Sequence, residues 1–455
     1  MEIKSTLSFL PSSSLALQAA VATCLGVAFS FLKISVVFLQ GLHTYIHPDD
    51  VNPTNNGVRA AIRRPGAPEP ELKPRRKSKE KFEFDENKAQ IFRLRLADGH
   101  LQSRLYFTQF RGTFNSTAIA LSCLWLHNCL PVSEESGFTA SGTIIPILLG
   151  FASVFWLIIL IARVSFERSA SNRSEKQLSI VLGFLGYQLG LVIVLDLLPS
   201  WVLDFGFESL DGFSRIGIAF LMGCIAGFFF MPAARGSRAF WLGTDQIRCN
   251  LSIIYCGWIG RTLLYANYLL VMFTSLLWIK PFADLLVNNH AYDRRRLHFI
   301  GDIDQLVGNL GMSQLDLENF RFWCLLASGV LQMATLRSNL QMYLNEAVLS
   351  WYQRLHASKV PDMGFSRAKV FLHNHILCLV VLQFFVPPAL VLLLLGLSQI
   401  DDNLFKNFQP VCTALPCSAL VGQVTLFMAW WILFVWAIYT SASLIMYRCG
   451  ILYVS

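Results

Sequence analysis

Long apolar runs alternate with shorter polar segments along almost the whole chain. The runs long enough to cross, or nearly cross, a bilayer cover residues 15–39, 113–131, 143–164, 178–199, 214–231, 253–279, 322–345, 371–398 and 420–447. Each is near the roughly 20 residues that span about 30 Å of hydrocarbon as an α-helix. None alternates polar and apolar residues as the strands of a membrane β-barrel do. The pattern predicts an all-α, polytopic helical membrane protein with about nine transmembrane helices.

The runs and the polar stretches between them divide the chain into five parts. They are a first transmembrane helix (1–40), a basic segment (41–112), transmembrane helices two to six (113–279), an outer loop (280–321) and transmembrane helices seven to nine (322–455). An alternative for the first part is a cleaved signal peptide, because Lys4 precedes an apolar run that contains Ala28 and Ser30.

Composition supports a membrane protein. Hydrophobic residues make up 54% of the chain and charged residues only 15%, and the mean hydropathy is +0.49. A soluble domain carries roughly a quarter charged residues. The eleven cysteines lie mostly in apolar runs, where we interpret them as packing residues. Cys412 and Cys417 instead share a polar loop, so they form a disulfide if that loop faces an oxidising compartment and are ordinary thiols otherwise.

The distribution of Lys and Arg predicts which way the chain crosses the membrane. Residues 40–112 hold fourteen basic residues, whereas loops 132–142 and 200–213 hold none. Cytoplasmic loops of membrane proteins are enriched in basic residues. We therefore expect an outer or lumenal N-terminus and a cytoplasmic C-terminus, in the plasma membrane or an endomembrane. The outer loop is the exception, since it contains Arg294, Arg295 and Arg296.

The basic segment also suggests partners. Residues 49–90 are rich in Pro and charge and are expected to be flexible. A basic stretch beside a membrane attracts anionic lipids, although it could equally act only as a topology signal. Other membrane proteins are further candidate partners. Nucleic acid is not expected, because no aromatic interleaving or known binding module accompanies the charge.

Three basic residues lie several residues inside predicted spans, where a charged side chain costs about 2.5–3.5 kcal/mol. They are Lys33, Arg261 and Arg337. The topology places all three in the cytoplasmic half and offers no carboxylate at their depth. Their side chains either extend to the cytoplasmic headgroups or surround a cavity that opens inward.

The seventh run carries a polar stripe. Arg337, Gln341 and Asn345 follow one another at four-residue spacing, with Ser338 beside them, so they share one helix face. A polar stripe is not expected to face lipid, and it serves either to join helices or to line a pathway. We predict that Arg337 points into the bundle, and that the stripe forms a candidate intramembrane site with Arg261 and Lys33.

Small residues predict a close helix contact elsewhere. Gly186 and Gly190 are four residues apart in the fourth run, and Gly223 and Gly227 are four apart in the fifth. Such pairs let two membrane helices approach closely.

Motifs of known enzyme classes are missing. The sequence contains no phosphate-binding glycine loop ending in Lys and Ser or Thr, no HExxH and no GxSxG. His373 and His375 are two residues apart and point to different faces of a helix. We therefore expect neither an enzyme nor a bound cofactor or metal.

Short motifs in matching order resemble the transmembrane protein 161 family over nearly the whole chain. They are Tyr45, His47 and Pro48; Asp204 to Gly206 with Glu208; Pro232 with Arg235; Leu276 to Pro281; Arg337 to Ala347; Leu382 to Phe384 with Pro387; and Trp430 with Trp431. The chain departs from the family around Arg294 to Arg296 and in the composition of the basic segment. The resemblance implies a multi-pass membrane protein without established enzymatic activity, linked in animals to excitability and rhythm.

Two functions follow as expectations. The first is a non-enzymatic membrane protein that modulates ion transport or a membrane complex. The alternative is a pore or transporter with an inward-facing polar, cationic cavity lined by the stripe. An intramembrane enzyme is the least favoured, because no paired acid and base or metal cluster is found in the sequence.

Overall fold

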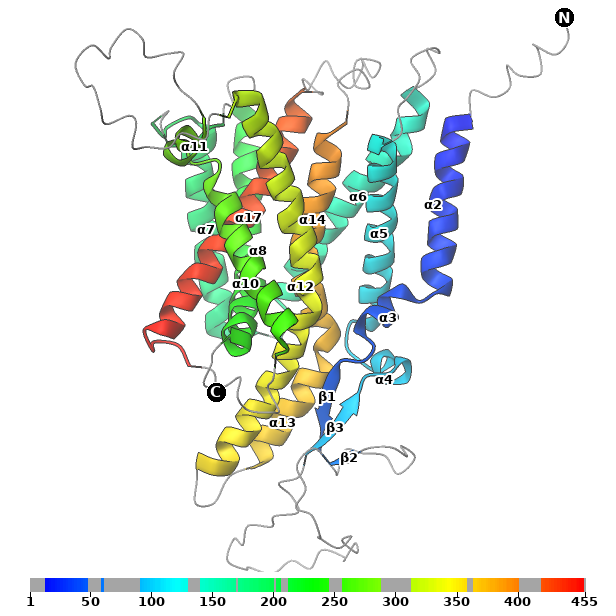
Figure 1. Ribbon diagram of the computed structural model, residues 1–455, viewed down its shortest axis with the longest axis vertical. Coiled ribbons are helices and arrows are strands. Elements are labelled where there is room, and N and C mark those ends of the chain that lie inside the picture. The colour runs from blue at the N-terminus through cyan, green and yellow to red at the C-terminus, as the bar shows by residue number, and fades with distance from the viewer. Residues whose placement is uncertain are drawn as a thin grey trace, which may run out of the picture.

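The computed structural model describes residues 13–47, 59–60, 91–129, 140–168, 171–199, 202–205, 212–244, 256–287, 312–357, 363–400 and 419–453. Long helices dominate these residues and run side by side along the long axis of the molecule (Figure 1). The predicted all-α class is confirmed, apart from one small sheet.

The helices follow the apolar runs. Their bounds are α2 Ser13–Phe31, α3 Ile34–Leu39, α4 Asp98–Gln102, α5 Phe107–Cys129, α6 Ala140–Ser165, α7 Arg173–Val194, α8 Gly212–Thr244, α10 Trp258–Leu276, α11 Lys280–Leu286, α12 Gln314–Ala357, α13 Met363–His375, α14 Leu377–Ser398 and α17 Ala419–Arg448. Within the described residues, α6, α7, α8, α14 and α17 supply five spans long and apolar enough to cross a membrane. An integral membrane protein is thus supported, whereas the count of about nine crossings stays a prediction.

Two predicted runs are each divided into two helices. The first breaks at Lys33, which adopts a left-handed backbone conformation with φ of 48° between α2 and α3. Such a φ is uncommon for a residue other than glycine. The eighth run divides at Ile376, between α13 and α14. The fifth and seventh runs are instead longer than expected, because α8 has 33 residues and α12 has 44.

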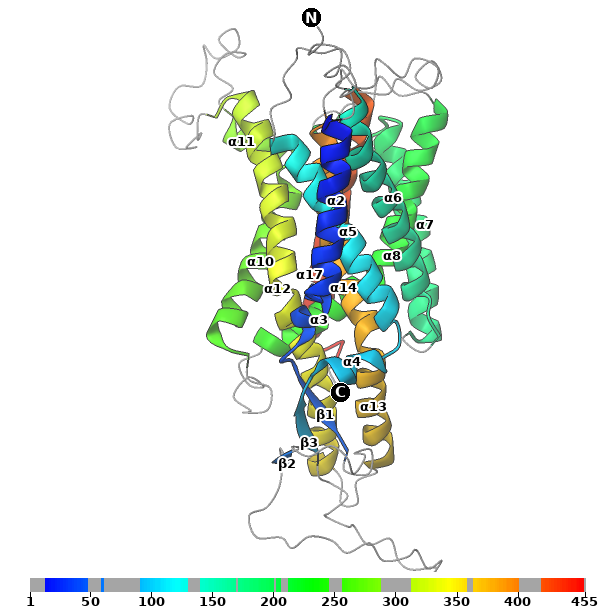
Figure 2. The same cartoon turned by 90° about the vertical axis from the view of Figure 1, so that its right-hand side faces the viewer.

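The core of the bundle is α14. All of its apolar window is buried, and it packs against α5, α6, α12 and α17. The turned view shows α10 and α12 along one side of the molecule and α6 and α7 along the other (Figure 2). Burial on every side explains why α14 is almost uniformly apolar and carries Gln383 as its one buried amide within Leu377–Leu397.

A three-stranded sheet lies at one end of the bundle, beside the ends of α12 and α13 (Figures 1 and 2). Its strands are β1 His43–Ile46, β2 Arg59–Ala60 and β3 Phe92–Arg95, in the antiparallel order β1-β3-β2. We call this end of the bundle the sheet end. The sequence analysis did not predict the sheet, although its two longer strands flank the segment expected to be flexible.

Helices α7 and α8 pack as the glycine pairs predict. A Cβ atom built on Gly186 would lie 2.4 Å from the Cβ of Ala226, and one built on Gly223 would lie 2.9 Å from the carbonyl oxygen of Gly183. Real Cβ atoms do not approach other atoms this closely. The predicted close contact is therefore confirmed, and glycine is required in it.

Candidate functional site

The polar stripe of α12 holds the edge of the sheet. The Gln341 side chain accepts a hydrogen bond from the His43 backbone N–H (2.9 Å) and donates one to the His43 carbonyl oxygen (3.1 Å). Its amide also donates a hydrogen bond to Oδ1 of the buried residue Asn345 (2.9 Å). An edge strand otherwise presents unpaired N–H and C=O groups. Gln341 thus takes the place of a neighbouring strand at His43.

A second amide, on α13, extends the same contact along β1. Asn374 donates a hydrogen bond to the Tyr45 carbonyl oxygen and pairs through Oδ1 with the Thr44 hydroxyl. Thr44 and Asn374 are both buried. Two helices therefore fix β1 by side-chain amides at successive residues, and they anchor both ends of the basic segment through the sheet.

Arg337 lies at the rim of the bundle. Its side chain is exposed, and Nη2 donates to the Gln40 carbonyl oxygen at 2.8 Å. Gly41 follows with φ of +79°, and a Cβ there would lie 3.2 Å from the guanidinium. The prediction that Arg337 points into the bundle is wrong, because the stripe faces the connection between α3 and β1. Arg337, Gln341 and Asn345 do share one face, as predicted.

Lys33 is separate from this stripe and has a carboxylate partner. Its Nζ lies 2.8 Å from Asp98 of α4, and this hydrogen bond holds the pKa of the Asp98 carboxyl below its ordinary value. The expectation that no carboxylate is available to these cations at their depth is therefore wrong for Lys33. The Lys33 side chain is half exposed, so the pair adds little to stability.

Arg261 lies on α10, beside the contact that α10 makes with Ser338 of α12. Gly260 packs on Ser338, since a Cβ on Gly260 would lie 3.3 Å from the Ser338 hydroxyl. The adjacent Arg261 is half-buried, and its Nε has no hydrogen-bond partner among the described residues. The predicted site residues therefore lie around α12, but they make separate contacts with different partners. Cys412, Cys417 and the arginines 294–296 lie outside the described residues.

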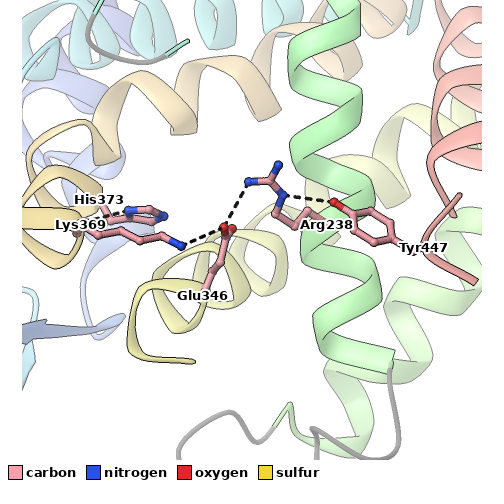
Figure 3. A network of polar contacts seen from close by, with 5 residues as sticks. All are labelled: Arg238, Glu346, Lys369, His373 and Tyr447. Atoms are coloured by element: carbon pink, nitrogen blue, oxygen red, sulfur yellow. Dashed lines mark hydrogen bonds and ion pairs between the residues drawn. The ribbon is translucent and has the colours of Figure 1, made fainter. Parts of the chain in front are cut away.

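Next to the stripe, Glu346 of α12 organises a charged network (Figure 3). Its Oε1 lies 3.2 Å from Nη1 of Arg238 on α8 and 4.0 Å from Nζ of Lys369 on α13. Arg238 Nε also donates to the Tyr447 hydroxyl of α17 at 3.2 Å. The Glu346 side chain is only 8% exposed. One buried carboxylate therefore pairs with two cations and connects α12 with α8 and α13.

One turn before Arg238, Arg235 donates a hydrogen bond to Oε1 of Gln383 on α14. The Gln383 amide donates in turn to the Val164 carbonyl oxygen of α6 at 3.4 Å. The buried amide of the central helix is thus used to join α8 and α6. A chain of polar contacts runs from α6 through α14 and α8 to α12 and α13.

Sequence reasoning missed the roles of Glu346, Arg235 and Arg238. From the sequence, Arg235 stands out only as part of a family motif, and neither Arg238 nor Glu346 is singled out as a site residue. A signal was present, because Glu346 directly follows Asn345 at the end of an apolar run, and the arginines are three residues apart on one helix face.

A different ion pair lies at the opposite end of α12. Arg321 Nη1 lies 2.8 Å from Asp204, its Nε donates to the Leu277 carbonyl oxygen at 3.0 Å, and its guanidinium lies over the Trp278 ring. The Arg321 side chain is buried. This contact fixes the N-terminal end of α12 to the turn after α10.

Comparison with known proteins finds one family. A family model described as predicted transmembrane protein 161AB matches residues 145–402, which is more than half of the chain. The match includes Arg235, Gln341, Glu346 and Gln383. No solved structure matches the chain.

Proposed function

Because the chain belongs to the transmembrane protein 161 family, we propose that it is a non-enzymatic multi-pass membrane protein that modulates ion transport or a membrane complex. The observation that carries this proposal is the pairing of Gln341 with the His43 backbone. It fixes β1, the first strand of the basic segment, to a membrane helix. The protein presents that segment to partners or lipids from a rigid base.

The same contact argues against the alternative of a pore lined by the stripe. The Gln341 amide is already bonded to His43 and Asn345, so it is not free to coordinate an ion. Arg337 is occupied by the Gln40 carbonyl oxygen. A permeation path through these residues would require the sheet to leave α12.

Flux through purified protein separates the two functions. We expect liposomes that contain only this protein to release no more chloride or potassium than empty liposomes. Ion flux without any added partner would contradict modulation and favour the pore.

The proposed arrangement has about nine crossings, with the sheet end in the cytoplasm. Support comes from Arg93, Arg95 and Arg104, which lie in or beside the sheet, since basic residues concentrate on the cytoplasmic side. Asn172, in the sequon Asn-Arg-Ser, is the N-cap residue of α7 and precedes the chain's fourth predicted run. We expect Asn172 to carry no glycan and protease to cut residues 61–90 only after vesicles are opened. A glycan on Asn172 would reverse the orientation.

The anchor itself is tested by Gln341→Ala. The substitution leaves the His43 N–H and C=O without partners, and we expect a loss of about 2 kcal/mol from two hydrogen bonds. Hydrogen exchange of the backbone amides of residues 43–46 should become much faster. Gln314→Ala, at the exposed start of the same helix, serves as the control and should leave exchange unchanged. Unaltered protection in Gln341→Ala would remove the basis of the proposal.

A further inference from the structure

We propose that the network around Glu346 is a binding site for a phosphate group, carried by a lipid or by a soluble anion. The site is formed by basic side chains of α8 and α13 and by a tyrosine hydroxyl of α12. It goes beyond the proposed function, because it concerns the interior of the helix bundle and not the basic segment.

The first observation is an excess of positive charge. Among the described residues, Arg235, Arg238 and Lys369 lie within electrostatic range of Glu346. Arg354 lies within range of Lys369, and Glu175 lies within range of Arg235. Four are cations and two are carboxylates. Excess charge is costly away from water unless an opposite charge accompanies it. A bound anion would supply that charge.

The second observation is a buried hydroxyl without a partner. Tyr343 is 6% exposed, and its OH makes no hydrogen bond among the described residues. Its ring stacks on His373 of α13, with centroids 4.8 Å apart. The hydroxyl lies within electrostatic range of Arg235, Arg238 and Glu346, so it belongs to the same cluster. Leaving a buried donor unsatisfied is unfavourable, and an anion would accept its hydrogen bond.

The types of donor favour a phosphate group. Guanidinium groups match the oxygens of phosphate with paired N–H donors, and a lysine adds a point charge. Arg235 and Arg238 lie one turn apart on α8, and Lys369 approaches Glu346 from α13. The Arg238 side chain is 38% exposed, so one member of the cluster reaches the protein surface.

The experiment uses the full-length protein in detergent and measures binding of dioctanoyl phosphatidic acid by calorimetry. Dioctanoylglycerol has the same chains without the phosphate and serves as the ligand control. Of these two ligands, we expect only phosphatidic acid to bind. Inorganic phosphate that competes at similar concentration would identify a soluble anion as the source, and failure to compete would identify a lipid. Equal binding of phosphatidic acid and dioctanoylglycerol would overturn the proposal.

Tyr343→Phe tests the assignment to this cluster. It keeps the ring on His373, so the melting temperature without ligand should not fall. Binding of phosphatidic acid should weaken about 10-fold, the effect of one hydrogen bond to a charged group. Tyr268→Phe is the matched control, because its hydroxyl is bonded to Ser441 in a different contact. Undiminished binding by Tyr343→Phe would reject the site.

Discussion

Replacing Gly186 by Ala is expected to destabilise the protein severely, although alanine is the better helix former. The new methyl carbon would lie 2.4 Å from the Cβ of Ala226, so α7 and α8 must separate. Overpacking of this kind costs about 1–3 kcal/mol. We expect the upper end of that range, because both atoms are attached directly to a backbone. The melting temperature and the yield of folded protein in detergent should both fall.

Two further variants make this result specific. Ala226→Gly removes the opposing methyl group, so the double variant Gly186→Ala with Ala226→Gly should recover most of the lost stability. Gly217→Ala is the control on α8, because a Cβ there meets nothing within 4 Å. It should be neutral or slightly stabilising. Equal losses in Gly186→Ala and Gly217→Ala would show that the close contact between α7 and α8 is not the cause.

Glu346→Gln is the second substitution with a large expected effect. It removes the carboxylate shared by Arg238 and Lys369 and leaves both cations without it. Breaking a buried ion pair costs about 3–5 kcal/mol, and the exposure of Arg238 reduces this to roughly 2–3 kcal/mol. Thermal unfolding of the purified protein measures the loss. Glu318→Gln, exposed on the same helix, should change nothing measurable.

The pH dependence of this variant gives an independent check. Burial already holds the pKa of Lys369 below its ordinary value of 10.5, and Glu346 opposes that shift. Without Glu346 the pKa falls further, so the folded state loses the Lys369 proton at a lower pH than the unfolded state. Stability then rises with pH as it approaches 10.5. The loss of stability caused by Glu346→Gln should therefore become smaller between neutral and alkaline pH. A loss that stayed constant would contradict this role of Lys369.

The helices could be predicted from sequence because every long apolar run overlaps a helix of the structure, although the first and eighth runs are each divided into two helices. The close packing of α7 on α8 could also be predicted, since glycines at four-residue spacing are a local signal. The polar stripe on α12 was located correctly, but its partner was not. Hydrogen bonds between Gln341 and His43 join residues 298 positions apart, and no local pattern encodes such a pairing.

The small sheet was missed for a related reason. Strands β1 and β3 have four residues each and are separated by a long polar segment. A strand this short gives little periodicity, and a two-stranded unit is marginal without support from other elements. That support comes from α12 and α13, so the sheet depends on tertiary contacts that the flanking sequence does not reveal.

The length of α12 has a mechanical consequence. Its 44 residues make a rod about 66 Å long, roughly twice the thickness of the hydrocarbon core. Arg321 fixes the rod near one end, and Gln341 carries β1 far along it. Gln341 lies 20 residues beyond Arg321, about 30 Å along the helix, so a tilt of about 5° around Arg321 would displace Gln341 by roughly 3 Å. A single unbroken helix therefore connects the contact at Asp204 and Trp278 with the sheet.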